Sequence, residues 1–471
     1  MKEKYDYLKK LFTRTNLLLF WILAILFVGC ATFYDKTFSL QQSIEQGNFE
    51  SAYKQLEKEK KWSTNNHRVL YDMNRGVVAF MLGKHEESND YFNKADFYIE
   101  DYSKKFGSEA LALVSNPMVR PYPPEDYEAI MVNYYKALNF IALKDYEGAL
   151  VECRRINIRL QVLNDRYKNH KNKYARDAFA HNLMGLIYDT MGDYNNAFTA
   201  YRHALDVYEN DYTTLFGITA PLQLKKDLML SAKKSGFHSE VRFYEKKFDM
   251  QTPSEVPGEG KLVYIWMNGF GPIKSEWSIN LTNMGTKNGN VIFGSSDLGI
   301  TFPLFIGNQS QEKQSSFKNL SFVRMAFPKL VDRPLQFNRA MLKYNNQNHP
   351  LELAEDINKI AHETLNDRML REMGNNILRL ATKQVVEQVG RSQNENLGTI
   401  LSIVNAMTEK ADTRNWQSLP YSISYAKIAM PPGNQTLELF QTGKNLQSTE
   451  KVEVTIHAGQ TTFQVFHQLG K

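Results

Sequence analysis

Two hydrophobic patterns divide this chain of 471 residues. From Phe33 to about Met250, apolar positions recur with the spacing of amphipathic helices, whereas many runs from residue 261 onward alternate apolar and polar residues as strands do. Residues 252–260 carry two prolines and two glycines between the patterns, so their composition predicts a linker. This order predicts an α+β multidomain chain with an all-α N-terminal part and a β-rich C-terminal part.

The C-terminal part changes period again. Strand patterns fill the predicted β-rich segment 261–350 and return in 412–471 around Pro431, Pro432 and Gly433. Between them, residues 351–411 show a helical period. We therefore expect a second domain built as a small antiparallel sheet or sandwich, with a helical insertion at 351–411 and a completing β segment at 412–471.

The helical part, predicted to span 30–251, repeats a spacing of glycine, aromatic and small residues. Its best copy has Gly185, Gly192, Tyr194, Ala197, Tyr201 and Ala204, and other copies include Gly83, Tyr146 and Ala149. Glycine ends one helix, the aromatic residue wedges into the turn, and the small residue lets two helices approach closely. This spacing closely resembles the tetratricopeptide pattern, which implies a helical solenoid. Turns are expected at Gly47, Gly83, Lys144 and Gly192, and 222–248 around Gly236 is expected to add a degenerate pair or a cap.

The N-terminus has the layout of a bacterial export signal, predicted as residues 1–29. Basic residues within 1–14 precede an unbroken apolar run at 17–28, which is short for a membrane span because a span takes roughly 20 residues. The run ends in Gly29 and Cys30 and resembles a lipobox, which implies lipid attachment at Cys30. Phe27 departs from that pattern, and an uncleaved signal anchor is the alternative. Ala31 replaces the aspartate that signals inner-membrane retention, so we expect a lipid anchor in the outer membrane, with the protein facing the periplasm.

Charge and cysteine content narrow the function classes. The formal net charge is +6, but the basic excess lies largely in the signal, so the chain lacks the concentrated basic face that nucleic-acid binding needs. We therefore expect no nucleic-acid partner. Of the two cysteines, Cys153 has no disulfide partner if Cys30 carries lipid. Because Cys153 lies in a helical apolar stripe, we interpret it as a small buried hydrophobe.

Six residues are candidates for binding. They are Arg120, Tyr122, Tyr127, Asp412, Arg414 and Trp416. The tyrosines with the nearby arginine suggest a ligand groove, although aromatic residues at helical spacing more often belong to a core. The C-terminal three suggest a ligand site, although an Asp/Arg pair beside a buried tryptophan more often clasps a helix to a strand.

No motif indicates catalysis, a cofactor or a metal. His362 begins like a zinc-protease motif, but Asn366 stands where the second histidine is needed. Gly269 and Gly271 begin like a dinucleotide loop, but Pro272 follows and the third glycine is missing. There is also no nucleophile elbow or phosphate loop. We therefore expect a noncatalytic protein without cofactors, although two carboxylates that meet only in space would leave no such signature.

Four segments together resemble an uncharacterised family of tetratricopeptide-containing bacterial envelope lipoproteins. They are residues 120–127, 134–138, 269–274 and 411–416. The resemblance covers nearly the whole chain after the signal and implies its architecture and its location. No functional residue carries over, because that family has no established activity.

These observations favour a lipid-anchored, noncatalytic scaffold or adaptor of the cell envelope. Its partner would be another envelope protein of unknown identity, bound through the helical-repeat surface. One alternative is a glycan-binding lipoprotein, which exposed tryptophan platforms would support. A further alternative is an enzyme that acts on the cell wall.

Overall fold

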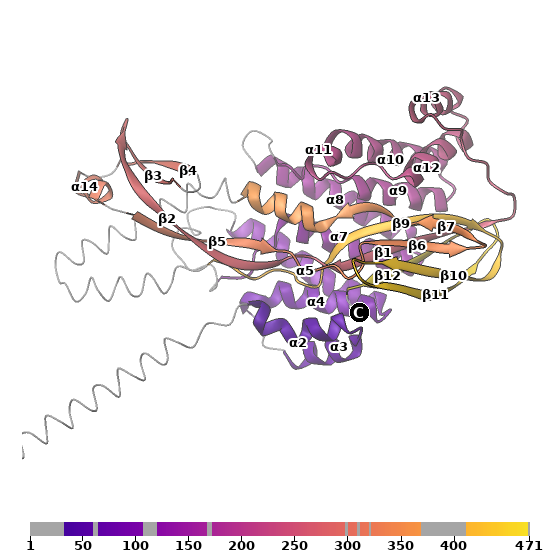
Figure 1. Ribbon diagram of the computed structural model, residues 1–471, viewed down its shortest axis with the longest axis horizontal. Helices are drawn as coiled ribbons and strands as arrows, with labels where there is room; N and C mark the ends of the chain where they lie inside the picture. The colour runs from indigo at the N-terminus through magenta and orange to yellow at the C-terminus, as the bar shows by residue number, and fades with distance from the viewer. Residues whose placement is uncertain are drawn as a thin grey trace, which may run out of the picture.

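The computed structural model describes residues 33–59, 65–106, 120–166, 172–296, 300–308, 311–319, 322–368 and 411–469. Figure 1 shows stacked helices against a region of strands, from which a long arm projects. The predicted signal 1–29, the lipid-attachment residue Cys30 and most of the predicted helical insertion lie outside the described residues.

The helical half is a row of helix pairs. The pairs are α2 (Phe33–Glu45) with α3 (Phe49–Lys58), α4 (Arg68–Met81) with α5 (His85–Phe106), α7 (Asp126–Ala142) with α8 (Tyr146–Arg166), α9 (Ala178–Thr190) with α10 (Tyr194–Val207), and α12 (Leu222–Lys234) with α13 (His238–Phe248). Short helical segments are η2 (Asn65–His67), η4 (Tyr208–Tyr212) and α11 (Thr213–Leu215). This arrangement confirms the predicted all-α N-terminal solenoid.

The turns within the pairs share one geometry. A residue in the left-handed conformation ends the first helix of each pair, with φ of 69° at Gly47, 71° at Gly83, 60° at Lys144, 78° at Gly192 and 74° at Gly236. At each turn this residue donates its N–H to the carbonyl three residues back, and the next N–H donates to the carbonyl five residues back. This is the hydrogen-bond pattern of the Schellman motif. The predicted turns are confirmed, and 222–248 forms a further helix pair.

The described part of the C-terminal half contains three four-stranded sheets. The central sheet has the order β12 (Thr461–Gln468), β1 (Gly260–Phe270), β9 (Pro420–Met430) and β8 (Glu352–Asp356). The outer sheet has the order β11 (Gln447–Ile456), β10 (Gly433–Thr442), β6 (Arg339–Tyr344) and β7 (Gln347–Pro350). The arm sheet has the order β4 (Ile300–Phe305), β3 (Asn290–Ser295), β2 (Ile273–Lys287) and β5 (Phe322–Val331).

One strand pair departs from the antiparallel sheet that we expected. The last strand, β12, runs parallel to the first strand, β1, with Lys261 opposite Thr461. A parallel pair needs a crossover connection and cannot be joined by a tight hairpin. Here the connection between β1 and β12 consists of nearly the whole β-rich half, so the first and last strands of that half lie side by side in the central sheet.

The central sheet lies between the helices and the outer sheet. Odd-numbered residues 263–267 of β1 belong to the helical core, whereas even-numbered residues 262–266 pack towards the outer sheet. Both faces of β1 are therefore buried, which explains its nearly continuous apolar sequence. On the helical side, α7 contacts β12 and α9 contacts β8. The helices and the central sheet thus share one hydrophobic core.

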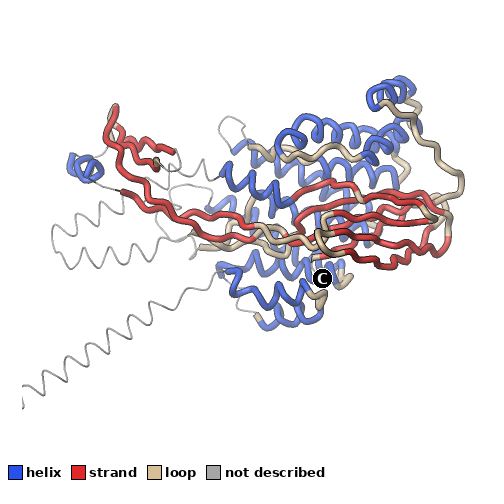
Figure 2. The backbone as a smooth tube through the Cα atoms, viewed as in Figure 1, coloured by secondary structure: helices blue, strands red, loops and turns tan. Residues whose placement is uncertain are grey.

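The arm is an antiparallel ribbon of β2 and β5. Its strands pair from Ile273 with Val331 to Thr282 with Phe322. β3, β4 and α14 (Gln311–Asn319) lie at its far end, and Figure 2 shows this end standing away from the body of helices and sheets. The base of the arm lies next to the N-terminus of α7, where the predicted binding residues are found.

The start of the predicted insertion is a strand and not a helix. Residues of β8 pair with β9, so the helix begins at residue 357 instead of 351 and is described as far as residue 368. The reason is tertiary: residues of β8 pair with β9, and Ala354 packs into the core shared with the helices. These long-range contacts outweigh the local helical period.

Candidate functional site

Three of the segments that carry the family resemblance meet at the N-terminus of α7. Segment 120–127 leads into α7, Lys274 lies near the start of β2, and segment 411–416 precedes β9. Hydrogen bonds, ion pairs and a cation–π contact link them in one largely buried network, which we call the clasp. Its members are Tyr122, Glu125, Glu128, Lys274, Arg368, Asp412, Arg414, Asn415 and Trp416.

Glu125 joins the helical half to the arm and to the helix that ends the described part of the insertion. Its carboxylate pairs with Lys274 Nζ and lies 2.6 Å from Arg368 Nη1. Burial raises the pKa of Glu125, but the positive charges of Arg368 and Lys274 outweigh burial, and the net pKa lies below its ordinary value. Glu125 is therefore a buried carboxylate that two cations compensate.

Glu128 is the hydrogen-bond acceptor at the centre of the clasp. Its Oε2 accepts the Tyr122 hydroxyl at 2.5 Å and the Glu125 N–H at 2.9 Å, and its Oε1 accepts the Trp416 N–H at 2.7 Å. The Glu125 contact is part of a capping box at the start of α7. Because Glu128 is fully buried, its pKa rises to about 6.

Arg414 ties the C-terminal segment to two loops of the helical half. Its Nη2 lies 2.7 Å from Asp412 Oδ2, and its Nη1 donates to the main-chain carbonyls of Asn66 and Arg120, both at 3.0 Å. Its guanidinium carbon lies 5.4 Å from the ring centroid of Tyr122. Arg414 is fully buried, so it acts as a cross-link between loops distant in sequence.

All six predicted binding residues lie in or beside the clasp. Tyr127 is 3% exposed, and Tyr122, Arg414 and Trp416 are 1% exposed or less. Arg120 contributes a main-chain carbonyl. Such burial leaves these four side chains almost no surface for a ligand, and it favours the interpretation of a structural clasp between helix and strand.

The repeat residues pack between the helices of a pair. A Cβ on Gly185 would lie 2.4 Å from the ring of Tyr201, so only glycine leaves room for that ring. Ala149, Ala197 and Ala204 are fully buried. These residues account for the close approach of helices that the repeat spacing predicts.

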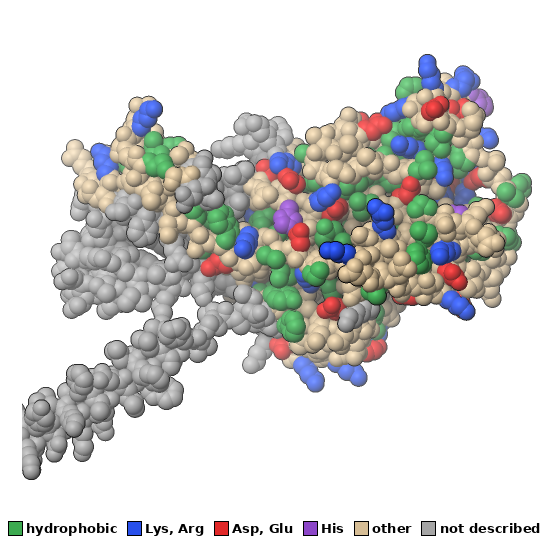
Figure 3. Space-filling model, in the orientation of Figure 1, with side chains coloured by type: hydrophobic (Ala, Val, Ile, Leu, Met, Phe, Trp, Pro, Cys, Tyr) green, Lys and Arg blue, Asp and Glu red, His purple; other side chains and the backbone are tan. Residues whose placement is uncertain are grey.

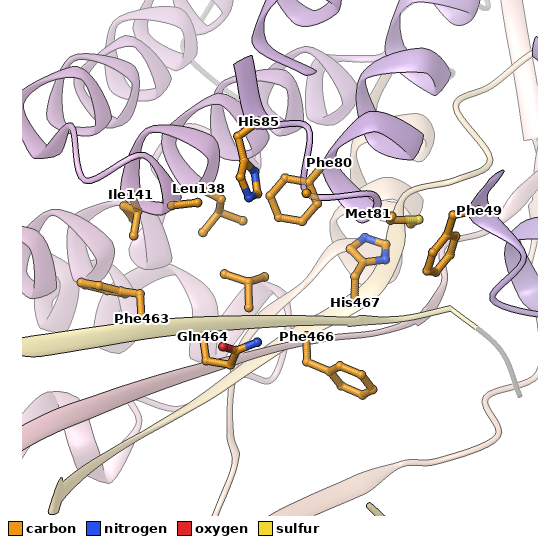
Figure 4. Close-up of a pocket in the computed structure, with 13 residues that line it drawn as sticks. Phe49, Phe80, Met81, His85, Leu138, Ile141, Phe463, Gln464, Phe466 and His467 are labelled. Carbon is orange, nitrogen blue, oxygen red and sulfur yellow. The ribbon is translucent and has the colours of Figure 1, made fainter. Parts of the chain in front are cut away.

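A pocket of about 410 Å³ lies between the helix ends and β12 (Figure 4). Its lining residues are Phe49, Phe80, Met81, Gly83, His85, Leu138, Ile141, Ala142 and the consecutive residues 463–467. The walls are mostly apolar, and the volume falls in the range of roughly 300–1,000 Å³ that is typical of ligand sites. The sequence analysis did not identify this pocket, because three helix pairs and the last strand build it together.

His467 contributes a hydrogen-bonded imidazole to the wall of this pocket. The Tyr135 hydroxyl lies 2.6 Å from His467 Nε2, and burial raises the pKa of Tyr135 well above its ordinary value, so the hydroxyl keeps its proton. Burial also lowers the pKa of His467 to about 3, and the imidazole is neutral. With Nε2 accepting from Tyr135, the imidazole proton is on Nδ1. Nδ1 is buried and has no hydrogen-bond partner within the described ranges.

Lys427 forms a second buried charge cluster that the sequence analysis missed. Its Nζ lies 2.6 Å from Asp189 Oδ2 and 3.0 Å from Asp227 Oδ1, and the three side chains are at most 8% exposed. The cluster ties β9 to α9 and α12. Burial raises the pKa of Asp227, and the Lys427 charge offsets it only in part. A lysine within the apolar run of β9 was the available sequence signal, because lysine is rarely buried without a partner.

Several other features bear on function. In the residues that the structure describes, no group of three or more His, Cys, Asp or Glu side chains is placed to hold a metal ion. No described helix is long and apolar enough to span a membrane.

Cys153 is buried, and burial raises its pKa. Trp266 and Trp416 are buried, so neither offers a glycan platform. Positive and negative side chains are interspersed on the face in Figure 3.

Comparisons with known proteins concern the helical half. The tetratricopeptide repeat model matches residues 180–211. The chain is similar to apo RapI, with 16% identity over 45% of this chain and 68% of that chain and a TM-score of 0.33. It is similar to MamA, with 17% identity over 47% of this chain and 96% of that chain and a TM-score of 0.28. It is also similar to kinesin light chain TPR-like repeats of Podosopora anserina, with 11% identity over 45% of this chain and 93% of that chain and a TM-score of 0.30. Among curated proteins, none matches this chain. The protein therefore contains a tetratricopeptide repeat, within a TPR-like helical solenoid that is joined to a β-rich C-terminal half.

Proposed function

We propose that this protein is a noncatalytic adaptor of the bacterial cell envelope, which binds another protein. The TPR-like solenoid is the observation that carries the proposal. Stacked helix pairs present extended surfaces, and folds of this kind are typically interaction modules without catalytic activity. The proposed role is therefore to hold a partner in place and not to transform a substrate.

The outer surface of the solenoid offers an apolar stripe for such a partner. On α8, Val151, Ile158 and Val162 are 48%, 60% and 48% exposed, and their spacing of seven and four residues places them on one helix face. The first helices of the second and third pairs are less available. α4 and α7 are buried along nearly their whole length, because α7 packs against β12 of the central sheet.

The second part of the proposal is a lipid anchor on Cys30 that holds the protein at the outer membrane, facing the periplasm. The lipobox-like sequence ending in Gly29 and Cys30 supports it. The first described helix, α2, begins at Phe33, three residues after Cys30. A lipid on Cys30 would therefore keep the first helix pair close to the membrane surface.

Crosslinking of the tagged protein in intact cells, followed by mass spectrometry, tests this function. We expect reproducible capture of one envelope protein, reduced by Ile158→Glu on the α8 stripe. Cys30→Ser is expected to release the protein from membranes or to leave an uncleaved precursor, and to lose the captured partner. Unchanged cleavage and membrane fractionation in Cys30→Ser would contradict the lipid anchor, and capture of abundant porins alone would contradict the adaptor.

A further inference from the structure

β12 is an edge strand, and its pairing with β1 determines which of its residues direct their main-chain N–H and C=O groups towards β1. Among the described strands it pairs with β1 alone, with Lys261 opposite Thr461. The Lys261 N–H donates to the Gln460 carbonyl at 2.8 Å. In a parallel ladder, a residue bonds to the two residues that flank its opposite number. The even-numbered residues of β12 therefore bond to β1.

The odd-numbered residues of β12 consequently direct their main-chain groups away from β1. They include Phe463, Val465 and His467, which are all only partly buried. Across the described part of the chain, these main-chain groups make no hydrogen bond to a further strand or loop. A row of unpaired N–H and C=O groups at a sheet edge is a template for another extended segment.

The pocket lies beside the same residues of β12. Neighbouring side chains of a strand point to opposite faces, and in Figure 4 Phe463 and His467 lie on the helix side while Gln464 and Phe466 lie on the other. All residues from 463 to 467 nevertheless line the pocket. The pocket therefore borders β12 along this whole stretch, and main-chain atoms can line it where a side chain points to the far face. Phe463, Val465 and His467 thus both line the pocket and carry the unpaired main-chain groups.

We propose that β12 binds an extended segment of a partner polypeptide, which adds as a strand beside Phe463 and Val465 and places one bulky apolar side chain in the pocket. This inference rests on the proposed adaptor function and specifies the chemistry of the segment that is bound. Main-chain donors and acceptors at two-residue spacing match a polypeptide, whereas an acyl chain would leave them unpaired.

Two substitutions separate the two parts of this site. Val465→Pro removes an outward-facing N–H and obstructs strand addition, but it costs no hydrogen bond to β1, and proline is tolerated at such edge positions. Ala142→Trp places a large ring in the pocket from the exposed C-terminal end of α7. Leu143→Trp is the matched control, because Leu143 is 41% exposed and does not line the pocket.

The probe is a display library of random linear peptides, selected against the full-length protein in detergent micelles. Fluorescence anisotropy then measures the enriched peptides. We expect them to share one bulky apolar residue. Ala142→Trp should weaken binding by about tenfold or more, the loss that follows when one large apolar side chain is no longer buried. Val465→Pro should weaken binding by a similar factor, because it obstructs strand addition. Leu143→Trp should bind as the wild type does. Circular dichroism of each variant confirms that it is folded.

Two results would overturn the inference. One is the absence of enriched peptides, or peptides whose affinity survives both substitutions. The other is binding of a fluorescent fatty acid that Ala142→Trp abolishes while no peptide is enriched, which would assign the pocket to a lipid. The cellular crosslinking separates this failure from failure of the adaptor function. A partner still captured by Val465→Pro would refute this site alone, whereas no partner captured by the wild type would refute the adaptor itself.

Discussion

Replacement of Glu128 by glutamine is the most informative perturbation of the clasp. Glu128 accepts hydrogen bonds from the Tyr122 hydroxyl and from the main-chain N–H groups of Glu125 and Trp416. Glutamine has nearly the same shape, keeps one acceptor oxygen and stays neutral at every pH. The variant also places an NH2 group where one carboxylate oxygen accepts a hydrogen bond. That loss is the same at every pH, so the pH dependence of the difference between wild type and variant reports the ionisation of Glu128.

The magnitude follows from the pKa of Glu128. Burial raises this pKa from 4.5 to about 6, and a difference of about 1.5 pKa units corresponds to about 2 kcal/mol. Because the folded state binds the proton more tightly than the unfolded chain, this stabilisation is fully present below the unfolded pKa and is lost as the pH rises through the folded pKa. We therefore expect the free energy of unfolding of the wild type, relative to Glu128→Gln, to fall by about 2 kcal/mol between about pH 4 and pH 7.

Urea unfolding at several pH values in this window measures the difference. Circular dichroism follows the helices, and tryptophan fluorescence follows tertiary packing, including that of buried Trp266 and Trp416. Coincident transitions would justify a two-state treatment. Glu453→Gln is the matched control, because Glu453 is exposed on β11. A wild-type minus Glu128→Gln difference that stays constant across the window would refute the assignment of a raised pKa to this buried carboxyl group.

Three further predictions test other parts of the fold. Lys427→Met leaves two buried carboxylates without their main cation and should destabilise the protein by about 3–5 kcal/mol in urea unfolding; an unchanged midpoint would contradict this role. Gly185→Ala brings a methyl group against the Tyr201 ring and should cost about 1–3 kcal/mol, seen as a lower melting temperature, although alanine favours helix. Buried Cys153 should resist iodoacetamide in the native protein and react in urea, and equal rates in both states would disprove its burial.

The positions of the turns within the helix pairs could be predicted from the sequence. The turns at Gly47, Gly83, Lys144 and Gly192 were predicted at the residues where the left-handed backbone occurs. This succeeded because such a turn depends on a few consecutive residues, and glycine is the residue that adopts a positive φ without a steric penalty. The repeat spacing also predicted that small residues let the paired helices approach closely, but the contact of Gly185 with the Tyr201 ring is seen only in the structure.

Contacts between residues far apart in the sequence could not be predicted from the sequence. The sequence analysis named Tyr122, Arg414 and Trp416, but it did not identify Glu128 as the acceptor that joins two of them. The Trp416 N–H bond to Glu128 spans 288 residues, and no local pattern specifies so distant a partner. The same reason explains the start of the insertion, where a strand formed beside β9 although the local period indicated a helix.

By itself, the sequence determined the solenoid of helix pairs, the strand-rich second half and the turn residues, because backbone propensity and hydrophobic period act over neighbouring positions. Only the tertiary structure decided that the central sheet shares a core with the helices, that the predicted binding residues lie in or beside a clasp, and that β12 has an edge, beside a pocket, with which no described strand pairs. These features depend on which surfaces meet when the chain closes. Burial of apolar surface and pairing of buried charges settle that choice over the whole molecule at once.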